Sequence, residues 1–382
     1  MSSYPPSGPP PTTTLRQRLA DLRGPAVPPR PLDARAIAAL AANPGCRRRA
    51  LLDGAGVDKN ALASALGSPA AFGQSQFAIV RGNSFEAKVK GDGGAELLRL
   101  VQEHLGAGAG PGAAEPPGPG APVPDLTAAG PEGRAARTAL ALREATAAGA
   151  WTLLDHPMLA LEVAGTPAYL EPDAVVVHPD GRWTVVEIKS FPLLDGAADP
   201  AKVGAAARQA AVYVLALEKT AAKVPGAEVG HTVLLVCPKD FSNQPAAAPV
   251  DIRRERAVTR RQLHRLTGVE ELAAALPAGL GFDPARPAGE LAEAVAAVPA
   301  AYAPECLAAC ELAFHCRERA RAADEAGALG RSVRGELGAL TTVGEALAAA
   351  AGAGSPEDPT AVALRRAARL RAEALESSAC RC

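Results

Sequence analysis

Two short apolar runs and the helix that follows them form the most regular pattern in the chain. Residues 174–177 and 183–188 are almost wholly apolar, and Pro179, Asp180 and Gly181 between them are typical of a hairpin turn. The pattern therefore predicts two buried strands joined by a tight turn. A helix is expected from about 201 to 217, and the apolar residues of 231–239 predict a further buried strand.

Three charged residues lie at the ends of the two predicted strands. Asp173 directly precedes the first run, and the second run ends in Glu187, Ile188 and Lys189. Glu187 and Lys189 are two residues apart, so both face the same side of their strand. Two carboxylates can hold a hard cation such as Mg²⁺ or Mn²⁺, with the carbonyl of Ile188 as a further oxygen ligand. Such a cation polarises a phosphodiester and acidifies water, and Lys189 can orient the water or offset developing negative charge.

An alternative interpretation needs no chemistry. The same residues can form a surface hairpin whose acidic and basic side chains make a weak ion pair. The apolar surroundings of both carboxylates favour the first interpretation, because an unpaired charge in an apolar run is costly.

The arrangement of these residues resembles a known enzyme family. Pro172 and Asp173, followed by Glu187, Ile188 and Lys189, are similar to the signature of the PD-(D/E)XK nucleases. The resemblance implies an α/β nuclease core, with a mixed central sheet flanked by helices. It also implies that Asp173, Glu187 and Lys189 are catalytic.

Two further motifs are similar to the RecB-like branch of that family. Gln209 and Tyr213 are four residues apart on the predicted helix, and the resemblance implies that they contact DNA near the metal. In Gly82-x-x-x-Glu86, Glu86 stands where the branch has a metal-binding histidine. A carboxylate suits a hard cation at least as well. His156, which precedes a proline at the start of a strand, is expected to be structural.

Four of the seven cysteines bracket the predicted core. Cys306, Cys310 and Cys316 form C-x3-C-x5-C, and Cys46 lies far upstream. On one continuous helix Cys316 would point about 240° away from Cys310, so the chain must bend if the three meet one centre. The arrangement resembles the iron–sulfur RecB-like nucleases, such as the CRISPR-associated exonucleases and the AddB nuclease domain, although their first gap is one residue shorter. The resemblance implies a [4Fe–4S] cluster, and zinc is the alternative that four thiolates also allow.

The overall charge gives no general attraction to nucleic acid. The net charge is −1 over 382 residues, so a DNA site must be a local patch. Residues 250–266 are strongly basic, with an expected edge strand followed by a helix, and we expect the phosphate contacts from Arg253, Arg254, Arg260 and Arg261. A solvated basic surface is the alternative.

Composition also divides the chain. Residues 1–31 are rich in proline and expected to be disordered, 32–317 to form the nuclease core, and 318–382 to be a helical extension. A helix capped by Asp33 is expected early in the core, and 106–133 is a Gly/Pro-rich insertion before a helix expected from 134 to 148. The sequence shows neither a membrane span nor a signal peptide, so we expect a cytoplasmic protein with no membrane partner.

These observations together predict a metal-dependent deoxyribonuclease. The resemblance implies exonuclease action on single-stranded or frayed DNA, in DNA repair, recombination or antiviral defence, with a helicase or another DNA-processing protein as a partner. Two alternatives remain open. One is a nuclease-like iron–sulfur subunit that binds DNA or serves as a scaffold without cleaving. The other is an interaction protein stabilised by zinc.

Overall fold

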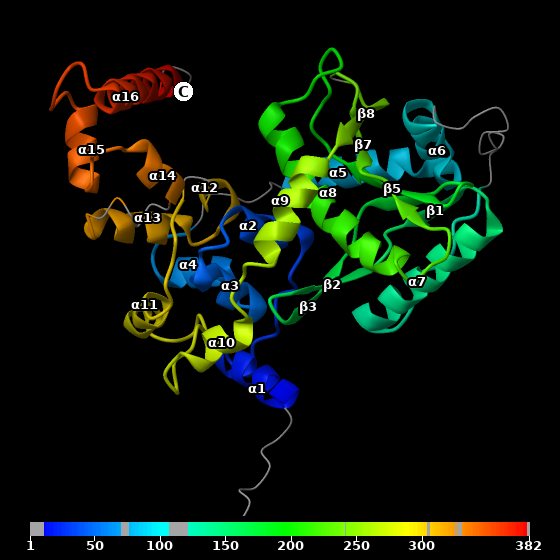
Figure 1. Ribbon diagram of the computed structural model, residues 1–382, viewed down its shortest axis with the longest axis horizontal. Helices are drawn as coiled ribbons and strands as arrows, with labels where there is room; N and C mark the ends of the chain where they lie inside the picture. Colours follow the sequence, from blue (N-terminus) through cyan, green and yellow to red (C-terminus); the bar gives the residue numbers. More distant parts are fainter. Residues whose placement is uncertain are drawn as a thin grey trace, which may run out of the picture. The chain divides into compact units, whose positions relative to one another are not determined.

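A computed structural model describes the chain in two compact units (Figure 1). The first unit comprises Met1–Pro29, Gly45–Phe72 and Glu271–Cys382, and the second comprises Arg30–Pro44 and Gly73–Glu270. The residues that the structure describes are 11–69, 76–106, 121–240, 242–303, 306–324, 326 and 331–379.

The second unit is built on a mixed β-sheet. Its strands are β1 (Thr152–Asp155), β4 (Ala174–Val177), β5 (Arg182–Ile188), β6 (Glu228–Val229), β7 (Thr232–Pro238) and β8 (Pro245–Asp251). They follow the order β1-β4-β5-β7-β8, and the short β6 pairs with β5. The β5–β7 pair is parallel, whereas β1–β4, β4–β5 and β7–β8 are antiparallel. A separate hairpin joins β2 (Leu159–Val163) to β3 (Thr166–Leu170). The expectation of an α/β fold with a mixed central sheet is confirmed.

The hairpin expected around the 179–181 turn is present as β4 and β5. Ala174 pairs with Val186 and Val177 with Trp183, so the start of β4 lies beside the end of β5. Gly181 in the turn has φ of +84°, and a Cβ there would lie 2.2 Å from the carbonyl oxygen of Gly226. Glycine is therefore needed at this position both for its backbone conformation and for the close approach.

Helices cover the sheet. The connection from β5 to the parallel strand β7 runs through α8 (Pro200–Ala221), which is capped by Asp199 and extends a few residues beyond the expected helix. Against α8 pack α2 (Ala34–Ala42), which Asp33 caps as expected, and α9 (Arg253–Leu263). The helix expected in the basic segment is α9. The edge strand is β8 (Pro245–Asp251), which lies almost wholly before that segment, because the chain is already helical from Arg253.

A second layer of helices packs on the sheet through an apolar core. Phe85 and Val89 of α5 (Gln76–Val89), and Leu97 and Val101 of α6 (Gly91–Leu105), are buried. Their core also contains side chains from four strands, namely Leu153, Ala174, Val176, Val186 and Leu234. Helix α7 (Gly130–Ala148) begins four residues before the expected helix, inside the Gly/Pro-rich stretch, of which 107–120 lie outside the described residues.

The secondary structure elements described for the first unit are all helices. Its helices include α1 (Pro11–Arg23), α3 (Arg47–Gly54), α4 (Lys59–Ala65), α11 (Ala288–Ala296), α12 (Cys306–Ala309), α13 (Ala313–Ala322), α14 (Arg331–Glu336), α15 (Val343–Ala350) and α16 (Pro359–Ala379). The short α10 (Val269–Ala274) contains the point in the chain, between Glu270 and Glu271, at which the second unit ends and the first resumes.

Two of the expected divisions differ from this arrangement. The stretch 1–31 contains α1, whose Leu22 is fully buried, where a disordered arm was expected; residues 1–10 lie outside the described part. The segment around Cys46 groups with the C-terminal helices instead of with the sheet, because its helices have their own apolar core. Among the described residues, no helix is both long and apolar enough to cross a membrane.

Candidate active site

Asp173, Glu187 and Lys189 meet where β4 begins and β5 ends. Asp173 Oδ2 accepts a hydrogen bond of 2.6 Å from the backbone N–H of Ile188. Lys189 Nζ lies 3.8 Å from the same oxygen and forms an ion pair with Glu187 Oε1. The antiparallel register of the two strands therefore brings together the three residues on which the sequence prediction rests.

Glu187 is the most deeply buried charged residue of this group, with 1% of its surface exposed. Burial raises the pKa of Glu187 to about 7; the neighbouring Lys189 opposes this rise and Asp173 adds to it. Burial also raises the pKa of Asp173, which Lys189 counteracts. Oε2 of Glu187 accepts no hydrogen bond from any residue that the structure describes. A buried carboxylate oxygen without a donor is an energetic cost that a bound cation would remove.

Glu86 reaches the same region from α5, where it is surrounded by basic groups. Its Oε1 lies 2.5 Å from Lys90 Nζ and 2.9 Å from His156 Nε2. Lys90 Nζ is also 2.7 Å from Asp155 Oδ1 at the end of β1. The hydrogen bond from His156 is the main cause that lowers the pKa of Glu86 to about 2, and it raises the pKa of His156 in turn. Glu86 is close enough to raise the pKa values of Asp173 and Glu187.

Lys90, Asp155 and His156 were not identified by sequence reasoning as members of the site. Lys90 lies one helical turn after Glu86, a spacing that suits an ion pair and could have indicated the contact. Asp155 and His156 reach the site because β1 pairs with β4, so that Asp155 lies opposite Ala174. The backbone N–H of His156 donates a hydrogen bond to the carbonyl of Asp173. The interpretation of His156 as purely structural overlooked its contact with Glu86.

Gln209 and Tyr213 lie on one face of α8, as their spacing predicts. Gln209 Nε2 donates to the Tyr213 hydroxyl at 3.0 Å, and that hydroxyl donates to the carbonyl of Glu171 at 3.3 Å. Burial raises the pKa of Tyr213, and nearby Glu187 and Asp173 raise it further. The pair thus lies close to the carboxylates.

The side chains of the site are arranged around two ammonium groups. Lys189 pairs with Glu187 and Asp173, and Lys90 with Glu86 and Asp155. Within the described ranges, no three side chains of His, Cys, Asp or Glu are positioned to hold one metal ion. Binding of a cation would therefore require the lysine side chains to rotate away from the carboxylates that they now neutralise.

The four arginines expected to contact phosphate all belong to α9, and they differ in their surroundings. Arg253 forms an ion pair with Asp251, and Arg260 pairs with Glu218 of α8. Arg254 and Arg261 are exposed. Part of the basic charge is thus neutralised within the protein, which leaves Arg254 and Arg261 as the residues best able to bind phosphate.

The four candidate cluster ligands all lie in the first unit. Cys46 precedes α3, Cys306 begins α12, Cys310 follows α12 and Cys316 lies in α13. The chain bends between α12 and α13, as it must if Cys316 is to face the other thiols. Burial raises the pKa of Cys316, and Cys46 and Cys306 are close enough to raise it further. Burial likewise raises the pKa of Cys310 to about 12, with a smaller effect from Cys316. Cys380 and Cys382 lie outside the described residues.

Two buried arginines accompany these thiols. Arg48 Nη1 donates to Cys316 Sγ at 3.1 Å, and its Nε donates to the carbonyl of Val298. Arg49 donates to the carbonyl of Ala309 and pairs with Asp53. Both guanidinium groups lower the pKa of a neighbouring thiol, Arg48 that of Cys316 and Arg49 that of Cys310. A nearby positive charge favours the thiolate over the thiol, and the thiolate is the form that binds metal. The two arginines therefore suit a metal-binding role for these cysteines.

Comparison with known proteins identifies no relative of this chain. The sequence matches no family model, and no curated protein or solved structure shows significant similarity to it.

Proposed function

We propose that the chain is a metal-dependent deoxyribonuclease with a PD-(D/E)XK-like core in its second unit. One observation carries the proposal: Asp173, the buried Glu187 and Lys189 converge at the end of a strand pair, and Glu187 Oε2 has no donor among the described residues. Two carboxylates beside one lysine at the end of a β-hairpin form a donor set suited to phosphodiester hydrolysis.

The residues that would hold Mg²⁺ or Mn²⁺ are Asp173, Glu187 and the carbonyl of Ile188, with Glu86 as a further carboxylate from α5. All are oxygen donors, which hard cations prefer, and the uncompensated Glu187 oxygen fits such an ion. When bound, the metal supplies a Lewis acid that polarises the phosphodiester and acidifies water.

Lys189 has the central role among the protein groups. Once its ammonium no longer neutralises Glu187, it can hold the attacking water and stabilise negative charge on the phosphate oxygens. Attack of the water oxygen forms one P–O bond while the bond from phosphorus to the leaving oxygen breaks. The water loses a proton and the leaving oxygen gains one. Gln209 and Tyr213 on α8 would orient the strand, and Arg254 and Arg261 would contact flanking phosphates.

The first unit supplies the second half of the proposal, a [4Fe–4S] cluster held by Cys46, Cys306, Cys310 and Cys316. The burial of Cys46 and Cys310, the bend between α12 and α13 and the adjacent guanidinium groups of Arg48 and Arg49 support it. Zinc on the same thiols is the alternative, and metal analysis of anaerobically purified protein distinguishes the two.

The test is cleavage of end-labelled single- and double-stranded DNA with Mg²⁺ or Mn²⁺. Lys189→Ala is compared with the wild type, and Lys219→Ala, at an exposed lysine of α8, is the matched control. Metal-dependent cleavage that is lost only in Lys189→Ala supports the proposal. A folded, metal-loaded wild type that cleaves neither DNA refutes it.

One observation favours a second candidate, a nuclease-like subunit that binds DNA without cleaving it. The ammonium groups of Lys90 and Lys189 already neutralise the carboxylates of the site. If this arrangement persists in the presence of Mg²⁺, DNA binding should be independent of the cation, and the Lys189→Ala substitution should leave binding unchanged.

A further inference from the structure

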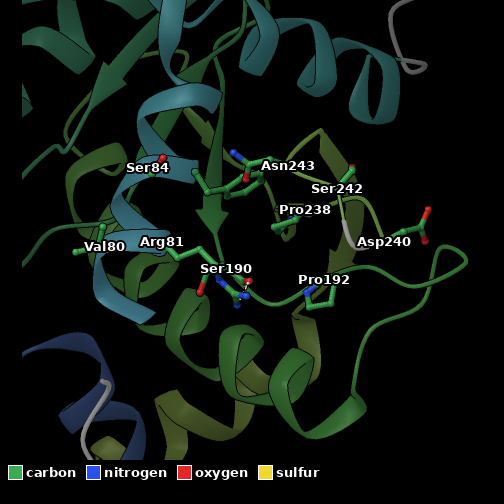
Figure 2. Close-up of a pocket in the computed structure, with 10 residues that line it drawn as sticks. Val80, Arg81, Ser84, Ser190, Pro192, Pro238, Asp240, Ser242 and Asn243 are labelled. Carbon is green, nitrogen blue, oxygen red and sulfur yellow. Dashed lines mark hydrogen bonds between the residues drawn. The ribbon is translucent and has the colours of Figure 1, made fainter. Parts of the chain in front are cut away.

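A pocket of about 470 Å³ opens beside the candidate active site (Figure 2). Its walls come from α5, from the segment after β5 and from the turn between β7 and β8. It contains Arg81 and Ser84 on the α5 side, and Asp240 and Asn243 on the turn. The volume lies within the range of about 300–1,000 Å³ typical of small-ligand pockets.

The pocket shares backbone with the site. Ser190, which lines the pocket, follows Lys189 directly, and Phe85, which also lines it, precedes Glu86. If a phosphate of a DNA strand lies at Lys189, the neighbouring nucleotide of that DNA strand would therefore lie at the mouth of this pocket. Proximity alone would allow many ligands, and the chemistry of the lining restricts the choice.

Arg81 gives one end of the pocket a fixed positive charge. Its Nη2 donates a hydrogen bond of 2.9 Å to the carbonyl of Ser190, and Figure 2 shows the guanidinium extending toward that residue. This bond orients the planar group while its other N–H groups remain able to bind an anion. Arginine held in this way is well suited to bind a phosphate through two parallel hydrogen bonds.

The remaining lining suits a nucleobase. Pro192, Pro238 and the exposed Val80 supply apolar surface on which a flat base can lie. Asn243 and Asp240 also line the pocket, and in Figure 2 Asn243 lies near Pro238 whereas the Asp240 carboxylate points away from the other lining residues. Asp240 Oδ1 accepts a hydrogen bond from the backbone N–H of Asp195, which fixes its position. The amide of Asn243 is able to bind the amino and carbonyl groups of a base edge.

We propose that this pocket binds one unpaired nucleotide of the DNA strand, adjacent to the phosphate that is cleaved. Arg81 holds the phosphate of that nucleotide, and the base lies between the proline surfaces and Asn243. The proposal rests on the nuclease function proposed above, and it assigns the binding of one unpaired nucleotide to the residues of this pocket.

The experiment fills the pocket and leaves the carboxylate site unchanged. Ser84→Trp introduces a large side chain into the pocket, and Arg81→Ala removes the phosphate ligand. Asn83→Trp is the matched control, since Asn83 is exposed on the same helix and does not line the pocket. Circular dichroism confirms that each variant is folded.

Two readouts separate binding from cleavage. Calorimetric titration with deoxyadenosine 5′-monophosphate in EDTA measures pocket binding alone, and steady-state kinetics on single-stranded DNA with Mn²⁺ measures KM. We expect Ser84→Trp and Arg81→Ala each to weaken nucleotide binding and raise KM about tenfold, with Asn83→Trp unchanged.

The possible failures are distinguishable. If the wild type cleaves DNA and both pocket variants retain its KM and nucleotide affinity, the pocket proposal is overturned and the nuclease stands. If the wild type binds the nucleotide, Ser84→Trp abolishes that binding, and no variant cleaves DNA, the pocket is supported as a nucleotide site and the nuclease function falls.

Discussion

The carboxylate of Asp173 accepts a hydrogen bond of 2.6 Å from the backbone N–H of Ile188. This bond joins Asp173 to β5, the strand that leads to Glu187 and Lys189. Asp173 is therefore both a candidate metal ligand and a structural link between β4 and β5. The two roles can be separated by substitution, because only one of them requires a negative charge.

We expect Asp173→Asn and Asp173→Ala to abolish cleavage equally but to differ in stability. Asparagine retains an oxygen that can accept the Ile188 bond. Alanine leaves a partly buried N–H without a partner, which costs about 1–3 kcal/mol of unfolding free energy. Urea denaturation of the two variants measures the difference, and equal midpoints would show that the bond contributes nothing.

The raised pKa of Glu187 predicts how activity depends on pH. A carboxyl group with a pKa of about 7 is protonated below that pH and cannot serve as an anionic ligand. The apparent affinity for Mn²⁺ and the cleavage rate should therefore rise as pH increases through about 7. A pH–rate profile at subsaturating Mn²⁺ tests this, and a profile that is flat from pH 6 to 8 would contradict it.

The raised pKa of Glu187 also affects how the stability of the metal-free protein depends on pH. Because the pKa of Glu187 in the folded protein lies above its ordinary value of 4.5, this carboxyl group stabilises the fold fully at low pH. That stabilisation is lost as pH rises from about 4.5 through about 7. Glu187→Gln, which cannot ionise, should reduce this part of the pH dependence of the unfolding midpoint in EDTA.

Lys90 should act as an internal competitor of the metal. Its ammonium pairs with Glu86 and Asp155, so Lys90→Met removes this positive charge from both carboxylates and leaves His156 as the basic neighbour of Glu86. We expect a lower melting temperature in EDTA and a larger increase on addition of Mg²⁺ than in the wild type. Thermal melting with titrated Mg²⁺ measures both effects. Lys88→Met, at an exposed position on the same helix, is the control and should behave as wild type.

The cysteine assignment predicts which thiols retain a metal centre. Cys46→Ser or Cys316→Ser should lower bound iron and visible charge-transfer absorbance, because each removes one of four thiolate ligands. Cys237→Ala is the control, since Cys237 is a fully buried thiol of β7 in the other unit. Iron analysis after anaerobic purification checks the expectation. Full iron content in Cys46→Ser would remove Cys46 from the ligand set, and bound zinc in place of iron would favour the alternative.

The sequence predicted the local elements of the site and missed those that depend on tertiary structure. Asp173, Glu187 and Lys189 belong to one hairpin, and Gln209 and Tyr213 to one helix, so strand and helix periodicity were sufficient to group each set. The contact of His156 with Glu86 depends on β1 pairing with β4 and on α5 packing over the sheet, and no periodicity encodes either. Similarly, the basic segment showed its charge but not that Glu218 of α8 neutralises Arg260.

The domain boundaries could not be read from composition for a related reason. A proline-rich stretch suggested disorder, yet Leu22 of α1 finds a buried position against residues distant in sequence. The phenylalanine at 282 shows this directly, because its backbone N–H donates to the carbonyl of Leu22. Contacts of this kind, between residues far apart in the sequence, determine whether a short segment such as α1 forms a helix.

Gly181 lies in the turn at the opposite end of the β4–β5 hairpin from the carboxylates, and it makes no contribution to their chemistry. Yet the turn sets the register in which Ala174 faces Val186, and a slip of one residue would reverse the side on which Glu187 projects. The relative positions of the candidate ligands therefore depend on the conformation of the turn. A substitution there would act on metal affinity from a distance, and variation at Gly181 should be constrained as tightly as variation among the ligands themselves.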